Sequence, residues 1–432
     1  MDQTEALIIE TIDRHREEIL EFARDIYSHA ELGYKEFQTS GKFVKKMEQL
    51  GLRTEKGFAI TGVKAYLNED KKENASLALL GELDALRIPE HAFANPETNA
   101  AHCCGHHAQM AGVFGAALAL TVPEIAEKLD GQVVFFATPA EEYGEIEFKN
   151  QLREQGKIRY GGGKCELLRI GAFDDIDLCL THHIRPGNEI LVGSGTGNGF
   201  VSKVIRVLGK ASHAAGAPEK GVNALSAASL GLQALGLNRE TFRDEDCVRV
   251  HPIITKGGNL VNVIPDEVVV ETLVRGKTIE AFTDAAKKTD RSFKAGAIAM
   301  GAKVEISTLP GYLPTLAEEA LPELKHAAEI SASDIPVIEA SGHAGGSTDV
   351  GDVQHLMPVY TFNTGGVKGG LHQIDFEVTD EEEAYIVTAK MFALAAYGLL
   401  KEKAQRSREL VDQYEPVFKN SAEYVEFMEQ FD

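Results

Sequence analysis

Residues 101–112 (AHCCGHHAQMAG) carry side chains that bind metals, and two more groups of such side chains follow along the chain. The pairs Glu141-Glu142 and His182-His183 each come directly after an apolar run. Thiolate, imidazole and carboxylate are the groups that bind zinc-like ions in proteins. A second Glu beside a ligand Glu indicates hydrolysis, because it can take a proton from water at the metal. The sequence therefore predicts a hydrolytic metal site.

In the first of these groups, Cys104 and His106 flank a glycine just before an apolar helix expected at 108–120. The glycine lets the backbone turn tightly, so both side chains can face one centre. A helix N-terminus also lowers the pKa of a cysteine and so favours the thiolate. Taken alone, the two residues fit a buried structural cysteine and a capping histidine equally well. Packing or support of the ligands is expected for the neighbours His102, Cys103 and His107.

The Glu pair and the His pair each follow an expected strand, at 132–138 and 176–181. The end of a strand that leads into a polar loop is where α/β enzymes keep their sites. Adjacent side chains diverge, so one of Glu141 and Glu142 can bind metal while the other reaches the water. An isolated acidic pair is usually a solvated one, and a single His at a strand end is usually not a ligand. Their coincidence with Cys104 favours the metal site.

Two other histidines are weaker candidates by spacing alone. His372 lies in the glycine-flanked segment 365–375 (GGVKGGLHQID). As a fifth ligand it would complete two metal sites that share one bridging group. His213 lies in 209–218 (GKASHAAGAP), between an expected strand and an expected helix, where the local sequence favours a capping or surface role.

The composition indicates an acidic globular protein. A chain of 432 residues is too long for one ordinary core, so two domains are expected. The formal net charge of -22 argues against nucleic acid and anionic membranes as partners. No apolar run approaches the length of a membrane span, and the charged N-terminus lacks a secretory signal. Five cysteines, an odd and sparse count, fit a reducing compartment, so a cytoplasmic protein is expected.

Strands that alternate with helices predict an α/β layer architecture for the first 196 residues. Helices are expected at 5–28, 40–50 and 108–120, and strands at 62–67, 76–81, 132–138 and 176–181. A different pattern follows: strand 200–208, helix 221–237, strands 247–255 and 267–275, helix 278–300 and strand 304–309. That order is typical of a ferredoxin-like sandwich. After Pro310 the first pattern resumes and ends in a helix at 380–401. We therefore expect a discontinuous catalytic domain, 1–196 and 311–432, with a second domain inserted at 197–310.

In this order the motifs resemble those of the co-catalytic metal amidohydrolases, the aminoacylase and carboxypeptidase-G-type enzymes. The resemblance is greatest to the branch of indole-3-acetyl-amino-acid hydrolases and aminobenzoyl-glutamate hydrolases, and it runs over nearly the whole chain. Each motif is weak by itself, but all of them in order make a specific signal. The motifs are HAELGYKE (29–36), GELDAL (81–86), CGH (104–106), PAEE (139–142), HIRP (183–186), SHA (212–214), NVIP (262–265), STDVGD (347–352) and LH (371–372).

The resemblance implies a fold and a set of roles. The fold would be a mixed-sheet, zinc-exopeptidase-like α/β/α catalytic domain with an inserted ferredoxin-like lid and dimerisation domain. Two divalent ions per chain are implied, with zinc expected and manganese, cobalt and nickel as alternatives. Their ligands would be Cys104, which bridges the ions, and His106, Glu142, His183 and His372. Glu141 would be the general base, and Asp84 would orient a ligand or the base.

Three residues of the inserted domain would face the substrate. His213 would donate to the oxyanion from the partner chain of a homodimer formed through this domain. Arg275 would pair with a substrate carboxylate, and Asn262 would hold the carboxylate or the acyl oxygen.

The implied activity is hydrolysis of the amide bond of an N-acyl or N-aroyl amino acid, by attack of a metal-bridging water. A metallo-dipeptidase or carboxypeptidase of the same family is an alternative that the local residues do not separate from it. A non-catalytic metal-binding scaffold is disfavoured, because the Glu pair and all five implied ligands are present. Two departures bear on the substrate pocket. His107 stands where relatives have Asp or Asn, and a long insertion (YGEIEFKNQLREQGKIRYGGGK) follows Glu142.

Overall fold

The computed structural model describes residues 1–431, and the chain divides into two compact units. Unit 1 comprises Met1–Gly195, Leu316–Gly342 and Asp352–Tyr424, and unit 2 comprises Thr196–Thr315, His343–Gly351 and the residues from Val425 on. The predicted division placed everything after residue 310 in the catalytic domain. It differs from the observed one at residues 196 and 311–315, which border the inserted domain, and at 343–351 and the residues from Val425 on, all of which join unit 2.

Unit 1 is built on an eight-stranded mixed sheet in the order β1-β2-β6-β3-β7-β17-β8-β15. Strands β6, β3, β7 and β17 run parallel to one another, and β2 pairs antiparallel to β6. Central strands such as β3 and β6 are buried along their whole length, as expected of parallel strands covered on both faces. The strands span Arg53–Phe58 (β1), Gly62–Leu67 (β2), Ser76–Glu82 (β3), Gln132–Thr138 (β6), Leu178–Ile184 (β7), Ile190–Val192 (β8), Val337–Glu339 (β15) and Val359–Thr364 (β17).

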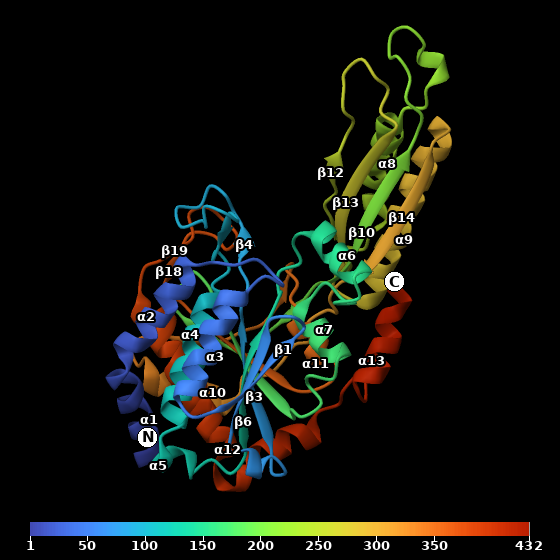
Figure 1. Cartoon of the computed structure of the whole chain (residues 1–432). Helices are drawn as coiled ribbons and strands as arrows, with labels where there is room; N and C mark the ends of the chain where they lie inside the picture. The colour runs from blue at the N-terminus through green and yellow to red at the C-terminus, as the bar shows by residue number, and fades with distance from the viewer. Residues whose placement is uncertain (432) are drawn as a thin grey trace. The chain divides into compact units, whose positions relative to one another are not determined.

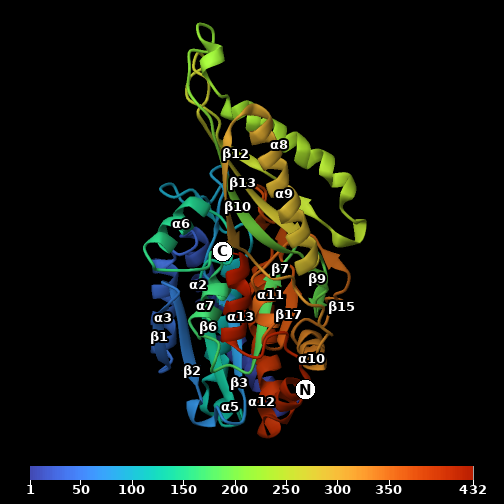
Figure 2. The ribbon, with the colours of Figure 1, turned by 90° about the vertical axis from the view of Figure 1, so that its right-hand side faces the viewer.

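Helices cover both faces of this sheet (Figures 1 and 2). Helix α4 lies against β3 and β7, and α12 packs on α4, while α7 lies on the opposite face. Every residue of α4 is buried, because the helix is enclosed between the sheet and its neighbouring helices. The predicted α/β layer fold is confirmed. The helices are α1 (Gln3–Arg14), α2 (Arg16–Ser28), α3 (Phe37–Gln49), α4 (His106–Leu120), α7 (Gly163–Arg169), α10 (Pro322–Ser331) and α12 (Thr388–Gln413).

We expected no apolar segment long enough to span a membrane, but one helical run in the structure is long and apolar enough. The run Glu382–Gln413, a π-helical turn followed by α12, passes that test by length and composition. However, 89% of its most apolar window is buried inside the structure. Packing against α4 and α10 therefore explains the apolar composition, as in the core helix of a globular domain. The helix is interrupted at Lys401, where the helix predicted from the sequence ends.

Unit 2 is a small α/β sandwich with an antiparallel sheet. Strand β13 pairs with β10 on one side and with β11 and β12 on the other, β14 pairs with β10, and α8 and α9 pack together. The predicted strand 247–255 is divided in two because Pro252 has no backbone N–H for the ladder. The elements are β10 (Gly199–Leu208), α8 (Ala224–Asn238), β11 (Arg249–Val250), β12 (Ile253–Lys256), β13 (Glu267–Gly276), α9 (Ile279–Met300) and β14 (Lys303–Pro310). This order of strands and helices is that of a ferredoxin-like fold.

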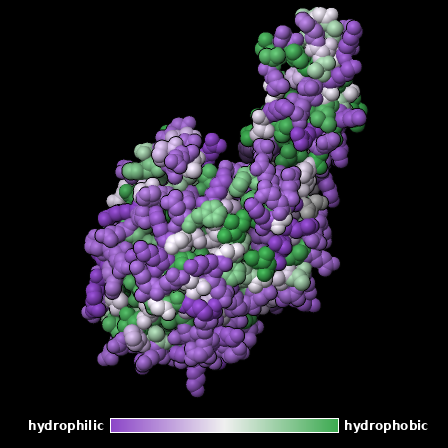
Figure 3. All heavy atoms as spheres, in the orientation of Figure 1, coloured by the Kyte–Doolittle hydropathy of each residue, from purple (hydrophilic) through white to green (hydrophobic). Residues whose placement is uncertain are grey.

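Hydrophilic residues dominate the face of unit 1 that is visible in Figure 3. They accord with the composition, in which 66 acidic residues outnumber 44 basic ones. An excess of acidic residues repels polyanions such as nucleic acid. That such polyanions are not partners stays a prediction.

The start of α7 is fixed by a close approach to the loop that carries Glu141. A Cβ at Gly163 would lie 1.6 Å from the carbonyl oxygen of Pro139. The N–H of Gly163 also donates to the carbonyl of Ala140, at 3.0 Å. Only a residue without a side chain therefore fits at this position.

Gly163→Ala is expected to lower the free energy of unfolding by roughly 1–3 kcal/mol, because the backbone must shift to accept the methyl group. Gly41→Ala in α3 is the control, since an added Cβ there meets nothing within 4 Å. This helix substitution should raise stability, by up to about 1 kcal/mol. Urea denaturation of both variants measures the difference. Equal stability of the two would contradict the close approach.

Candidate active site

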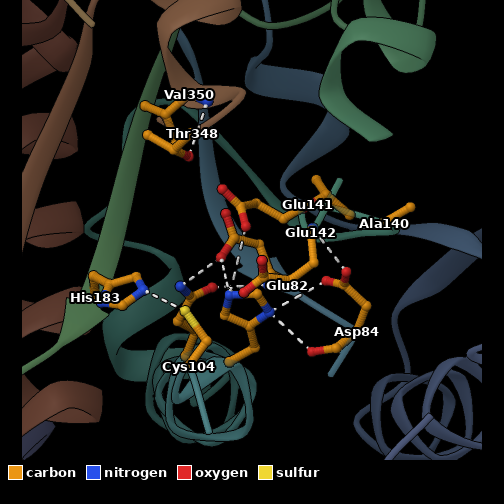
Figure 4. A network of polar contacts seen from close by, with 12 residues as sticks. Glu82, Asp84, Cys104, Ala140, Glu141, Glu142, His183, Thr348 and Val350 are labelled. Carbon is orange, nitrogen blue, oxygen red and sulfur yellow. Dashed lines mark hydrogen bonds and ion pairs between the residues drawn. The ribbon is translucent and has the colours of Figure 1, made fainter. Parts of the chain in front are cut away.

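The carboxyl ends of the parallel strands bring the candidate residues to one edge of the sheet in unit 1. Glu82 ends β3, Glu141-Glu142 follows β6, and His183 lies near the end of β7. His372 follows β17 along the chain, and Cys104 immediately precedes the turn into α4. Figure 4 shows the side chains of Cys104, His183 and the three glutamates gathered around one centre. This edge is the place where open α/β sheets bind ligands.

Cys104 is the residue around which the others are arranged. Its Sγ lies 3.3 Å from Nε2 of His183 and 3.3 Å from Nε2 of His372. Nε2 of His372 is in turn 3.1 Å from Oε1 of Glu142. The ligand atoms of Cys104, His106 and His183 lie within 4.8 Å of one another, as do those of Cys104, Glu142 and His372. Two groups of three ligands therefore share one sulfur.

The turn between Cys104 and His106 requires a glycine. Gly105 has φ +89, in the left-handed region, and a Cβ there would lie 2.0 Å from Cγ2 of Ile184.

Alternation of side chains along β7 directs His182 and His183 to opposite faces of the sheet. His182 is buried and lies 2.8 Å from the Thr364 hydroxyl through Nε2, so it is a core residue and not a candidate ligand.

Buried hydrogen bonds fix the orientation of the histidines. Nδ1 of His106 lies 2.9 Å from the carbonyl oxygen and 3.2 Å from Oδ1 of Asp84, so Nδ1 carries the proton and Nε2 faces the site. Nδ1 of His183 likewise donates to the carbonyl of Ile184, at 2.8 Å. Oδ2 of Asp84 accepts the backbone N–H of Glu142, at 2.9 Å. The carboxylate of Asp84 therefore holds His106 and Glu142 together.

The donor set fits a divalent metal. Among residues 1–431, Nε2 of His106 has no hydrogen-bond partner although it is buried. Burial, with a contribution from the charge of Glu142, raises the pKa of Cys104 well above its usual range. A divalent cation would reverse that effect, because it binds the thiolate. One sulfur, several imidazole nitrogens and carboxylate oxygens are the ligands that zinc and similar ions accept.

The two glutamates of the pair differ in position. Glu142 contacts His372, whereas Oε2 of Glu141 lies 3.9 Å from Nε2 of His106. Figure 4 shows both side chains directed toward the same centre from adjacent positions of the loop. This loop is strained, since Ala140 has φ +49. The strain fits a functional loop, whose conformation the surrounding contacts impose.

Sequence reasoning missed Glu82. Its Oε2 lies 3.2 Å from Nε2 of His106, and the ligand atoms of Glu82, His106 and Glu141 form a third group within 4.8 Å. Lys164 and Gln109 bind the same carboxylate, at 2.5 and 2.8 Å. The motif GELDAL held a signal for it. Glu82 and Asp84 are separated by one residue at the end of a strand, and in extended backbone such side chains point to the same side, so both acids were candidates.

The two departures from the family pattern have structural explanations. His107 is buried against Tyr27 and Tyr385, with Nε2 3.2 Å from the Tyr385 hydroxyl, and burial lowers its pKa to about 3. It is therefore a neutral core residue. The insertion after Glu142 forms a helix, Ile146–Glu154 (α6), and Nζ of Lys149 in this helix donates to the carbonyl of Glu142 at 2.6 Å. The insertion thus fixes the backbone of a site residue.

The structure places the other three predicted residues in unit 2. His213 and Asn262 lie on neighbouring segments, since the N–H of Ala214 donates to the carbonyl of Asn262 at 3.0 Å, and both side chains are exposed. Arg275 lies at the other end of β13, where its Nη1 is 3.0 Å from the Ser347 hydroxyl. Unit 2 therefore does not bring Arg275 together with the other two.

Glu36, in the HAELGYKE motif, is a buried carboxyl group behind the site. It accepts the N–H of Ala140 at 2.8 Å and the hydroxyl of Thr61 at 2.7 Å. Burial, assisted by the charge of Asp84, raises its pKa to about 7. The pKa of an unfolded Glu is lower, so the stability linked to this group is greatest in acid and decreases as the pH rises toward 7.

Glu36→Gln keeps the shape of the side chain but removes the titration. We expect the wild type to lose roughly 1–3 kcal/mol relative to the variant between about pH 4.5 and pH 7. Urea denaturation of both proteins across this range, after treatment with chelator, measures the difference. Parallel stability curves would show that Glu36 has an ordinary pKa.

Comparison with known proteins agrees with this geometry. The model of Peptidase family M20/M25/M40 matches residues 78–397. The Xaa-Arg dipeptidase of Mus musculus is 27% identical over 408 residues, which cover 91% of this chain and 85% of the mouse protein. The IAA-amino acid hydrolase ILR1-like 2 of Arabidopsis thaliana is 30% identical over 272 residues, or 61% of this chain and 56% of the plant protein.

A solved structure shares the fold. The Bacillus subtilis YXEP protein, a dinuclear metal binding peptidase from the M20 family, superposes with a TM-score of 0.63 at 23% identity, over 90% of this chain and 99% of that protein. The family match extends over most of the chain and includes the Cys104, Glu142 and His372 group. The chain therefore belongs to Peptidase family M20/M25/M40 and is a metal-dependent amidohydrolase.

Proposed function

We propose that the protein hydrolyses the amide bond of N-acyl or N-aroyl amino acids with two divalent ions. The observation that carries the proposal is the sulfur of Cys104, shared by two groups of three potential ligands. One ion is assigned to Cys104, His106 and His183, and the other to Cys104, Glu142 and His372. Zinc suits this mixture of sulfur, nitrogen and oxygen ligands, with manganese, cobalt and nickel as alternatives.

In this mechanism the protein supplies the groups that move protons and stabilise charge. When bound by these residues, the ions would supply Lewis acidity, which polarises a carbonyl and lowers the pKa of a water. Glu141 accepts the proton of that water as the new C–O bond forms, and returns a proton to the amine nitrogen as the C–N bond breaks. Asp84 keeps Nδ1 of His106 protonated and the backbone of Glu142 in place. His213 would donate to the oxyanion.

The substrate class is supported by the chemistry of unit 2 and by the named relatives. Arg275 offers a guanidinium group, which pairs with the carboxylate of an amino acid in a fixed planar geometry, and Asn262 offers an amide for the carboxylate or the acyl oxygen. The plant relative is an IAA-amino acid hydrolase and the mouse relative a dipeptidase. A dipeptide therefore remains the second candidate substrate, since its bond breaks by the same chemistry.

We also assign a homodimer formed through unit 2. His213 and Asn262 lie beyond one end of β13 and Arg275 at the other, a separation of roughly 30 Å for ten extended residues. One small substrate cannot contact both ends of the same unit. A second copy would supply the missing residues if the dimer brings His213 of one chain to the site of the other. Unit 2 also exposes the apolar side chains of Ile253, Leu260 and Val261, which a contact between copies would bury.

Glu141→Gln is expected to keep its metal and to lose activity by about 10²–10⁴-fold, because the amide cannot accept a proton. Release of amino acid is measured from N-acetyl, N-aroyl and indole-acetyl amino acids, aminobenzoyl-glutamate and dipeptides, after loading with zinc, manganese or cobalt. Preference for dipeptides would favour the second candidate substrate. A wild-type rate in Glu141→Gln would remove Glu141 as the base.

Mixing two inactive variants tests the homodimer. Chains with His213→Ala and chains with Glu141→Gln are denatured together and refolded in equal amounts. A mixed dimer has one site with both an intact Glu141 and an intact His213 from the other chain, so activity should return to about a quarter of wild type. Monomers by sedimentation, or no recovery from mixed dimers, would rule out a shared site.

A further inference from the structure

Glu82 is a buried and firmly held carboxylate at this edge of the sheet, and it has no part in the proposed mechanism. Its side chain is 3% exposed. Gln109 in α4 is bound to it twice: the N–H of Glu82 donates to Oε1 of Gln109 at 2.8 Å, and Nε2 of Gln109 donates to Oε2 of Glu82 at 2.8 Å. The position of the carboxylate is therefore fixed from the strand and from the helix.

A buried cation keeps this carboxylate charged. Lys164 in α7 is fully buried, and its Nζ lies 2.5 Å from Oε1 of Glu82. A lysine and a glutamate are rarely buried together unless their pairing offsets the loss of hydration. Lys164 therefore delivers an ionised carboxylate to the site.

Oε2 of Glu82, which also accepts from Gln109, faces a ring nitrogen of His106. Nε2 of His106 is 3.2 Å from Oε2 of Glu82, yet in the described part of the chain it has no hydrogen-bond partner. Nδ1 holds the proton in its contact with Asp84, which leaves Nε2 a lone pair. Nitrogen and oxygen ligands of one tetrahedral ion, each about 2.1 Å from it, are about 3.4 Å apart. The observed spacing is close to that of two ligands of one ion.

We propose that Glu82 binds the same divalent ion as His106, as an additional oxygen ligand, and that Lys164 is the residue that positions it. This inference rests on the proposed metal-dependent function and adds a ligand to the five assigned above. Glu141 belongs to the same group of ligand atoms within 4.8 Å. Glu82 would fill a coordination position of the ion from the side of β3. Glu141 would then not be needed as a ligand and could act on water.

The first test uses metal binding rather than activity. Glu82→Gln and Lys164→Met are compared with wild type by chelator competition for zinc and by the visible spectrum of the cobalt-loaded protein. Loss of a ligand, or of the group that orients it, is expected to weaken one of the two ions at least 10-fold and to change the cobalt spectrum. The other ion, bound by Glu142 and His372, should keep its affinity.

Glu166→Gln is the matched control. Glu166 is a buried carboxylate in the same helix as Lys164, but it binds Arg169 and the backbone of residues 159 and 160. This variant should retain both affinities and the cobalt spectrum. If Glu82→Gln and Glu166→Gln bind zinc equally well, the proposed ligand is wrong.

A crystal structure of the zinc-loaded wild type tests the proposal without any variant, in case Glu82→Gln does not fold. Anomalous density within about 2.2 Å of a Glu82 oxygen is expected. Two ions bound at the five other ligands, with Glu82 beyond bonding distance, would overturn this inference and leave the proposed function intact. A wild type that binds no ion would overturn both.

Discussion

The site depends on one fully buried carboxylate, that of Asp84. One of its oxygens faces Nδ1 of His106 and the other accepts the N–H of Glu142, so two segments separated by more than thirty residues are held in register. Buried carboxylates are costly unless each lone pair finds a donor, and here both oxygens have one. The same contacts decide which nitrogen of His106 carries the proton. Asp84 therefore sets both the positions and the protonation states on which metal binding depends.

Around Asp84, unfavourable charges are offset by specific partners. Lys164 compensates Glu82, whereas Glu36 is held by the neutral N–H of Ala140 and hydroxyl of Thr61, and burial raises its pKa to about 7. In the absence of metal, burial also disfavours the thiolate of Cys104. These groups would not be stable together in an ordinary core, which is why perturbed carboxylates and thiols in one place indicate a functional site. Divalent cations at the shared sulfur would balance the remaining negative charge.

Much of this arrangement follows from sequence because its chemistry is local. Neighbouring residues set the turn at Gly105 and the ends of the strands that precede Glu141 and carry His183. The types and spacing of those residues therefore predicted where the turn and the strand ends lie. Glu82 was missed because its importance comes from Lys164, which is eighty-two residues away and is brought close only by the packing of α7. Likewise, the segment 343–351 joins unit 2 because its first two residues pair with residues 196–197. The hydrophobic pattern of the sequence does not indicate this pairing.

The three residues of unit 2 to which the resemblance gives substrate contacts do not lie together in one chain. His213 and Asn262 are close to each other because their backbones pair, and the ten residues of β13 then place Arg275 at the opposite end of the sheet. Strand length alone therefore divides the three residues into two groups that no single small molecule can contact within one copy. If all three serve one reaction, the chemistry itself requires two chains. The oligomeric state would then be part of the catalytic site, because a monomer would keep the metal ligands and lack a complete set of substrate contacts.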